Sequence, residues 1–259
     1  MASHHTRSLS FLAKVHPIVE QFDSQLSRLR SSQATSTSSL LKQTLTSLKD
    51  LYTSVDAVLQ LPKNQQAIAQ DVHSKWTEEV LDRSLKLLDI CSTSRDVLVQ
   101  SKESLHDIQS VLRRSCSGEL NITSEVAQYL NTRKSAKKLI KKSLKNVKDI
   151  EQTNKNNAIE SMLKDVNTIT LDILKSVLSY LGGSKLESQK SKWSLVSKLM
   201  QKSDNKEEST TSNNFDDVDA TLESTIRQKN KNGVENMRSQ MTKLESEIQS
   251  LDEALDSFC

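Results

Sequence analysis

The chain has 259 residues, of which 35% are hydrophobic, 27% are charged, 4 are Gly and 2 are Pro. So few turn-forming residues exclude a β-rich fold, because β-strands are bounded by turns that contain Gly and Pro. An all-α fold is expected, with a core of Leu, Ile and Val because aromatic residues make up only 3% of the chain. The net charge of +3 is uneven, with 8 basic residues and 1 acidic residue in 126–150 but 14 basic and 18 acidic residues in 151–259.

The first 70 residues predict two helices and a short third segment, behind a flexible N-terminus that covers residues 1–15. Pro17 suits the first turn of a helix, where its missing N–H is not needed, and apolar residues follow it at helical spacing as far as Leu29. The second helix is expected at residues 39–60. Pro62 ends it, because proline removes a backbone donor and clashes with the preceding turn.

The longest predicted helix runs from Trp76 to Ser115 without Gly or Pro, which corresponds to about 60 Å. Apolar residues recur along it at helical spacing and predict a single stripe that is buried in a bundle. This stripe comprises Leu81, Leu85, Leu88, Cys91, Leu98, Leu105, Ile108 and Leu112. Ser94 and Arg95 interrupt the stripe, so a bend or a polar contact is expected near the middle of the helix.

Three more helices are expected before residue 200, which makes residues 16–200 an elongated multi-helix bundle. They are expected at residues 124–152, 158–181 and 185–200. The second of them ends at Gly182-Gly183, since glycine readily adopts the left-handed conformation that terminates a helix. Residues 201–217 are polar and are interpreted as a linker.

Residues 218–259 are expected to form a C-terminal, coiled-coil-like helix. Its apolar residues alternate spacings of four and three, which is the pattern of a heptad seam. The seam comprises Met237, Met241, Leu244, Ile248, Leu251, Leu255 and Phe258. This seam predicts either a homodimer through residues 237–258 or docking on the chain's own bundle. Docking is favoured, because the seam lasts only about three heptads.

The three cysteines, Cys91, Cys116 and Cys259, match no zinc or Cys-x-x-Cys spacing, and their odd number argues against a secreted disulfide scaffold. Cys91 lies on the apolar stripe and is expected to be a buried structural cysteine rather than a nucleophile. No apolar run reaches the ~20 residues that span a bilayer. An intracellular, cytoplasmic protein is therefore expected. The alternatives are peripheral membrane association and organelle targeting, the latter because the start of the chain lacks acidic residues.

The sequence contains no pattern of catalytic or metal-binding residues. Its five histidines lack metal-ligand spacing, and its 4 glycines form no phosphate-binding loop. The carboxylates fall on the polar faces of the expected helices. We therefore expect no enzymatic activity, no cofactor and no metal site.

The sharpest local feature is a basic amphipathic helix, in which lysines crowd about four turns despite their mutual repulsion. Its basic residues are Arg133, Lys134, Lys137, Lys138, Lys141, Lys142, Lys145 and Lys148. They form either a solvated face or a binding site for an anionic membrane surface or a calmodulin-like acidic protein. Nucleic acid is disfavoured, because no aromatic residue of the run could stack on bases. The acidic residues within 244–259 are expected to compete for this basic face.

Two serines are candidate phosphorylation sites. Ser10 follows Arg7 by three residues and Ser117 follows Arg114 by three residues, a spacing that suits basophilic kinases.

The string LDRSLKLLDICSTSRDVLVQSKESLHDIQSVLRR, from Leu81 to Arg114, is similar to the signature of a plant-specific family of unknown function related to the BYPASS proteins. Other similar pieces are residues 7–10 followed by His16-Pro17, residues 40–62, residues 134–148 and the heptad tail. The chain departs from the family where residues 11–15 replace its usual proline-bearing stretch. The resemblance implies a helical, non-enzymatic plant protein linked to root and shoot development, with no catalytic residues to transfer.

The expected function is therefore non-enzymatic and is exerted through contacts with other proteins in growth or development. The alternative is a peripheral membrane adaptor that binds anionic lipid through the basic helix at residues 133–148. Binding to anionic rather than neutral liposomes would separate the two.

Overall fold

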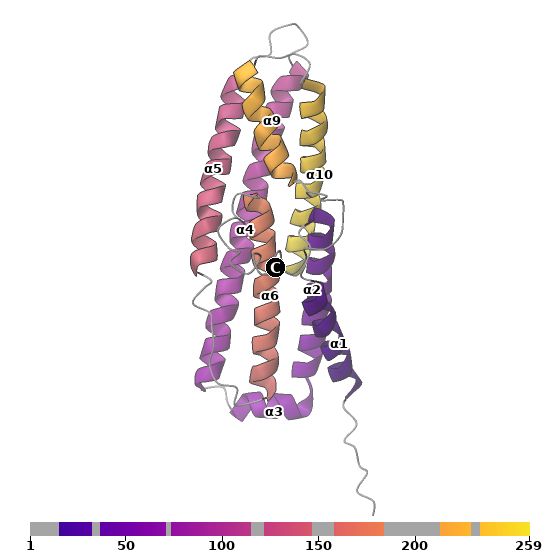
Figure 1. Ribbon diagram of the computed structural model, residues 1–259. Coiled ribbons are helices and arrows are strands. Elements are labelled where there is room, and N and C mark those ends of the chain that lie inside the picture. Colours follow the sequence, from indigo (N-terminus) through magenta and orange to yellow (C-terminus); the bar gives the residue numbers. More distant parts are fainter. Residues whose placement is uncertain are drawn as a thin grey trace, which may run out of the picture.

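The computed structural model describes residues 16–32, 37–70, 74–114, 122–146, 158–183, 213–228 and 234–259, which form eight α-helices and no β-strand. The helices are α1 (Pro17–Ser31), α2 (Ser38–Leu59), α3 (Pro62–Gln70), α4 (Lys75–Arg114), α5 (Thr123–Asn146), α6 (Ala158–Gly182), α9 (Asn214–Gln228) and α10 (Val234–Phe258). They pack side by side as a tall bundle, with α3 lying across its lower end (Figure 1). The all-α fold class is confirmed.

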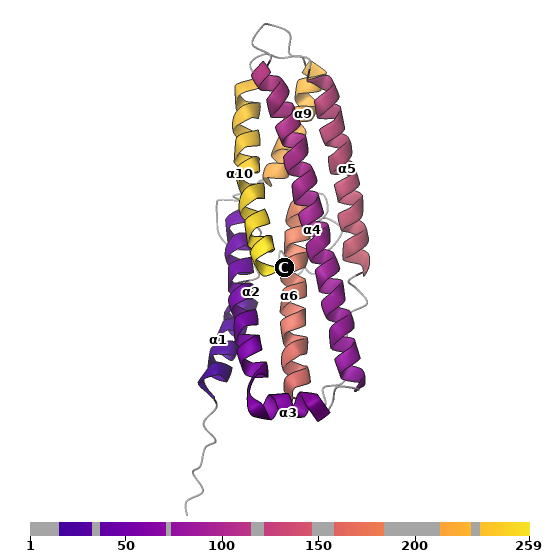
Figure 2. The ribbon, with the colours of Figure 1, turned by 180° about the vertical axis from the view of Figure 1, so that it is seen from behind.

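Helix α6 is the centre of the bundle. Of its 25 residues, 15 are buried, and it packs against α1, α2, α4 and α5. Both ribbon views place it between the other long helices (Figures 1 and 2). Buried apolar residues such as Ile169, Leu171 and Leu174 lie on different sides of α6, as expected for a helix that its neighbours enclose on most sides.

The C-terminal helix α10 docks on the chain's own bundle. It packs against α2, α4 and α9, and its heptad residues from Met237 to Leu255 are buried in the common core. The sequence predicted this helix and favoured this docked arrangement. A homodimer through residues 237–258 would require the same seam to leave the core of the chain. The homodimer stays a prediction.

Helix α9 begins at Asn214, inside the segment 201–217 that the sequence indicated to be a linker. Its apolar residues Phe215, Val218 and Leu222 are buried, and the side chain of Asn213 accepts a hydrogen bond from the backbone N–H of Phe215 at 3.0 Å. The prediction of one C-terminal helix over residues 218–259 was therefore wrong at its start, since residues 218–228 belong to α9 and α10 begins at Val234. Three apolar residues amid acidic ones are too short a run to indicate a separate helix. Residues 201–212 and the predicted helix at 185–200 lie outside the described residues.

Helix α4 follows its predicted bounds, but its predicted buried stripe is correct only in the C-terminal half. Leu98, Leu105, Ile108 and Leu112 are buried there, whereas three leucines of the N-terminal half are exposed. They are Leu81 at 60%, Leu85 at 63% and Leu88 at 52%. The prediction was wrong because α4 continues past the lower ends of α5 and α10, so fewer helices cover its N-terminal half (Figures 1 and 2). Leu87 and Ile90 are buried there instead.

The middle of α4 is joined to the C-terminus of the chain. Cys91 is buried, as expected, and forms a disulfide with Cys259 across a sequence separation of 168 residues. Arg95 Nη2 lies 2.7 Å from Asp256 Oδ1, which is the polar contact expected near this point of the helix. The pairing of Cys91 with Cys259 was not predicted, because three cysteines without a motif spacing give no indication of which two meet.

The disulfide should stabilise the folded chain by closing a long loop in the unfolded one. Reducing it should lower the free energy of unfolding by about 2–4 kcal/mol, as measured by urea unfolding with and without a reductant. Cys259→Ser is the control, because it should unfold identically under both conditions. Identical unfolding of the parent protein under both conditions would contradict a bond between Cys91 and Cys259.

Candidate functional site

The basic helix predicted from the sequence is α5, and its cations divide into two groups. Those that point away from the bundle are Lys134, Lys138, Lys141, Lys142 and Lys145. Arg133 is buried with 2% of its surface exposed, and Lys137 is half-buried. Lys148, Ser10 and Ser117 lie outside the described residues.

Arg133 belongs to the core rather than to a binding face. Its Nε donates to Asp219 Oδ1 at 3.2 Å and its Nη1 donates to Leu181 O at 2.9 Å. Its guanidinium also lies 4.3 Å from the centre of the Phe215 ring, a favourable cation–π arrangement. Leu181 is in the last turn of α6, where a cation stabilises the helix end. Arg133 therefore joins α5, α6 and α9.

Lys137 and Tyr129 converge on the same carboxylate. Lys137 Nζ lies 2.9 Å from Asp219 Oδ2 and 3.9 Å from Asp216 Oδ1, and the Tyr129 hydroxyl donates to Asp219 Oδ1 at 3.0 Å. Burial, and then the negative charge of Asp219, raise the pKa of Tyr129 well above its ordinary value, so its hydroxyl stays protonated and donates. Two of the predicted anion-binding residues, Arg133 and Lys137, are thus engaged within the chain.

The sequence suggested that the tail at residues 244–259 would supply the acidic partners of α5. The structure shows that they come from α9 instead. In the tail, Glu245 accepts a hydrogen bond from Gln109 Nε2 at 3.0 Å, and Asp256 pairs with Arg95. Both of these tail contacts are to α4. The sequence showed that opposite charges were available but not which acidic segment would lie beside α5.

The exposed lysines of α5 surround a further apolar residue, Leu139, which is 39% exposed. We call Lys134, Lys138, Lys141, Lys142 and Lys145 the lysine face. It carries five positive charges on one helix, which can attract an anionic surface within about 8–10 Å at physiological salt.

The second candidate surface is the exposed part of α4. We call Leu81, Leu85 and Leu88 the leucine stripe. They succeed one another at spacings of four and three, so they share one side of the helix. Single exposed leucines are ordinary in folded proteins, but adjacent ones along one helix face are typical of a contact surface.

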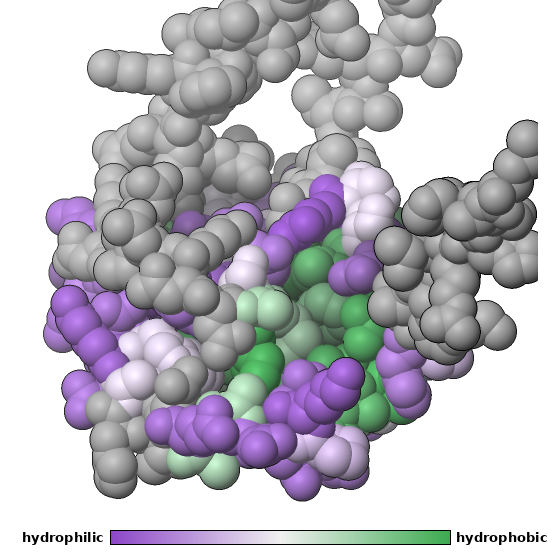
Figure 3. Space-filling view, turned by 90° about the horizontal axis from the view of Figure 1, so that it is seen from below, coloured by the Kyte–Doolittle hydropathy of each residue, from purple (hydrophilic) through white to green (hydrophobic). Residues whose placement is uncertain are grey.

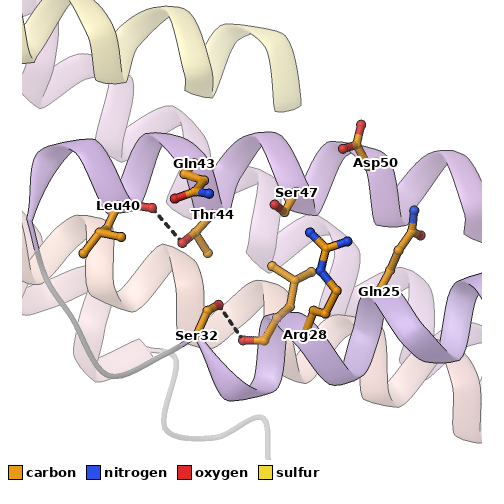
Figure 4. Close-up of a pocket in the computed structure, with 9 residues that line it drawn as sticks. Gln25, Arg28, Ser32, Leu40, Gln43, Thr44, Ser47 and Asp50 are labelled. Atoms are coloured by element: carbon orange, nitrogen blue, oxygen red, sulfur yellow. Dashed lines mark hydrogen bonds between the residues drawn. The ribbon is translucent and has the colours of Figure 1, made fainter.

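A polar hollow lies between α1 and α2. Its cavity volume is about 150 Å³, and Arg28 extends from α1 toward α2 within it (Figure 4). Its wall is held by local bonds, in which Thr44 Oγ1 donates to Leu40 O at 2.7 Å and Ser32 Oγ donates to Leu29 O at 3.0 Å. These are helix-internal contacts and give no pairing of a nucleophile with a base.

A larger cavity of about 550 Å³ lies between α1, α2 and α6 at the lower end of the bundle. Phe22, Leu26 and Ile159 are among the apolar residues that line it, and Arg30 at its rim pairs with Asp165 at 3.2 Å. The view from below shows hydrophobic surface in a hollow bordered by hydrophilic residues (Figure 3).

Among the described residues, no group of three or more His, Cys, Asp or Glu side chains could hold a metal ion. No described helix is both long enough and apolar enough to cross a membrane.

Comparison with known proteins identifies a family but no characterised relative. No curated protein and no solved structure matches the chain. The family model described as Protein BPS1 matches residues 44–259, which include α4, the lysine face and the C-terminal helices. Because this match spans most of the chain, the protein belongs to the BPS1 family, a plant protein family linked to development.

Proposed function

We propose that the protein is a non-enzymatic binding module that acts in plant development by contacting another protein through the leucine stripe. The observation that carries this proposal is the exposure of Leu81, Leu85 and Leu88, at 52% to 63%, on a helix whose apolar stripe is buried in the other half. Burying apolar surface contributes roughly 25 cal/mol per Å². Covering the stripe with a partner would therefore make the free energy of binding more favourable.

Proximity labelling in plant root tissue tests this proposal. A variant with Leu81→Gln, Leu85→Gln and Leu88→Gln should lose the partner that the parent protein labels. Its fold should be kept, because all three residues are exposed. The control is Val99→Gln, which changes an exposed apolar residue of the same helix outside the stripe. The same set of labelled proteins for the parent and the triple variant would contradict the proposal.

A second candidate function is attachment to an anionic membrane through the lysine face. It is supported by five lysines that point away from the bundle on α5. Lysines near an anionic lipid surface contribute roughly 1 kcal/mol each. An acidic, calmodulin-like protein would use the same lysines.

Vesicle binding distinguishes this second function. Replacing Lys134, Lys138, Lys141 and Lys142 with Gln should weaken binding to anionic vesicles by at least about tenfold, as measured by co-flotation. Lys137→Gln is the control and should change little, because Lys137 is already paired with Asp216 and Asp219. The membrane function is wrong if the fourfold variant floats like the parent, or if neutral vesicles bind equally well.

A further inference from the structure

Helix α10 runs antiparallel to α4 in a regular register. Three α4 side chains spaced seven residues apart bond to α10 residues that follow one another in the opposite order. The pairs are Arg95 with Asp256 at 2.7 Å, Lys102 with Gln249, and Gln109 with Glu245 at 3.0 Å. Seven residues are almost two helical turns, so this line of α4 side chains marks the side on which α10 lies.

The same line continues into the leucine stripe. Seven residues before Arg95 is Leu88, and seven residues before Leu88 is Leu81, with Leu85 one turn away from Leu81. Helix α10 ends at Phe258, and its neighbour Cys259 is bonded to Cys91, so α10 stops one turn before Leu88. Above Cys91, this side of α4 faces α10. Below Cys91 it is lined by the leucine stripe, which the described part of the chain leaves 52% to 63% exposed.

We propose that the leucine stripe receives an amphipathic helix of a partner protein, which lies antiparallel to α4 and follows the path of α10 toward the lower end of the bundle. This inference rests on the proposed function and specifies the partner's structure. A helix in this place would repeat the packing of α10 on α4, with apolar residues at spacings of three and four facing the stripe.

The charges beside the stripe specify the flanks of that helix. Glu78, Asp82 and Asp89 are exposed on this part of α4. Of these, Asp82 pairs with Lys86 at 2.7 Å, which leaves Glu78 and Asp89 to face a partner. With Lys75, Glu79, Arg83 and Lys86 counted as well, residues 75–89 carry four acidic and three basic residues, so their net charge is −1. A partner helix with basic flanks is complementary to Glu78 and Asp89.

Fluorescence anisotropy with a synthetic helix tests this inference on the full chain. The probe is a peptide of about 20 residues, with leucines at spacings of three and four and lysines on both flanks. A matched peptide carries glutamates in place of the lysines. The parent protein should bind the basic peptide at least about tenfold more tightly than the acidic one, and the Leu81→Gln, Leu85→Gln, Leu88→Gln variant should lose at least about tenfold in affinity for it.

Every other outcome overturns the inference. Equal binding of both peptides would show that charge does not select the partner helix, although the stripe could still be a contact surface. The proposed function would then be tested separately by proximity labelling. Equal binding of the basic peptide by the parent and the variant would place it elsewhere on the chain. A dimer that the three Leu→Gln changes dissociate, measured by light scattering, would identify a second copy as the occupant.

Discussion

Replacing Asp219 with alanine should destabilise the bundle by about 3–5 kcal/mol, because it leaves the buried guanidinium of Arg133 without its counter-charge. Arg133 is 2% exposed, so water cannot replace the lost carboxylate around its guanidinium. Its Nη2 already lacks a hydrogen-bond partner, so little is left to compensate for the lost carboxylate. Urea unfolding measures the effect.

The double variant Arg133→Met with Asp219→Ala is the control for this prediction. It removes the charge together with its partner, so it should recover much of the stability lost in the single variant. If Asp219→Ala alone unfolds at the parent's urea concentration, Arg133 is not held in the core by α9.

Leu105→Ala should cost about 2–5 kcal/mol in unfolding free energy, because it leaves a cavity where α4 packs in the core. Leu88→Ala should stay within about 0.5 kcal/mol of the parent. The two changes remove the same atoms from the same helix, and they differ in that Leu105 is fully buried while Leu88 is 52% exposed. Urea unfolding of the two variants side by side gives the comparison.

Equal losses at the two positions would mean that the leucine stripe is covered in the folded chain. Two neutral results would mean that α4 does not pack as the structure shows. Either result would remove the basis for a contact surface on α4.

Most of the helices could be predicted from the periodicity of apolar residues. The bounds of α1, α2, α4 and α6, and the C-terminal end of α10, follow from apolar spacing, Pro17, Pro62 and the glycines after Leu181, since all of these act within a few residues of the chain. Periodicity shows that a helix has an apolar side but not whether another helix is long enough to cover it. The exposure of Leu88 depends on where α5 and α10 end, which is a property of the assembled bundle.

The candidate site was predicted only in part, because the periodicity of one helix does not show which other helix packs against it. The sequence was sufficient to recognise α5 as a basic helix. It did not show which cations are exposed and which, like Arg133 and Lys137, are bound within the chain. That separation depends on Asp219, which lies on a helix that the polar composition around Phe215 concealed. A four-residue spacing between Arg133 and Lys137 opposite two aspartates was the available signal, but it requires knowing that α9 packs on α5.

Thiol labelling at position 85 most directly tests whether the leucine stripe is a contact surface. In a Cys116→Ser background, Leu85→Cys should react readily with a maleimide in the purified protein, because the site is exposed. In intact plant cells it should be protected, whereas Lys42→Cys on the exposed side of α2 should react alike in both settings. Equal labelling of positions 85 and 42 inside cells would show that nothing covers the stripe and would contradict the proposed function.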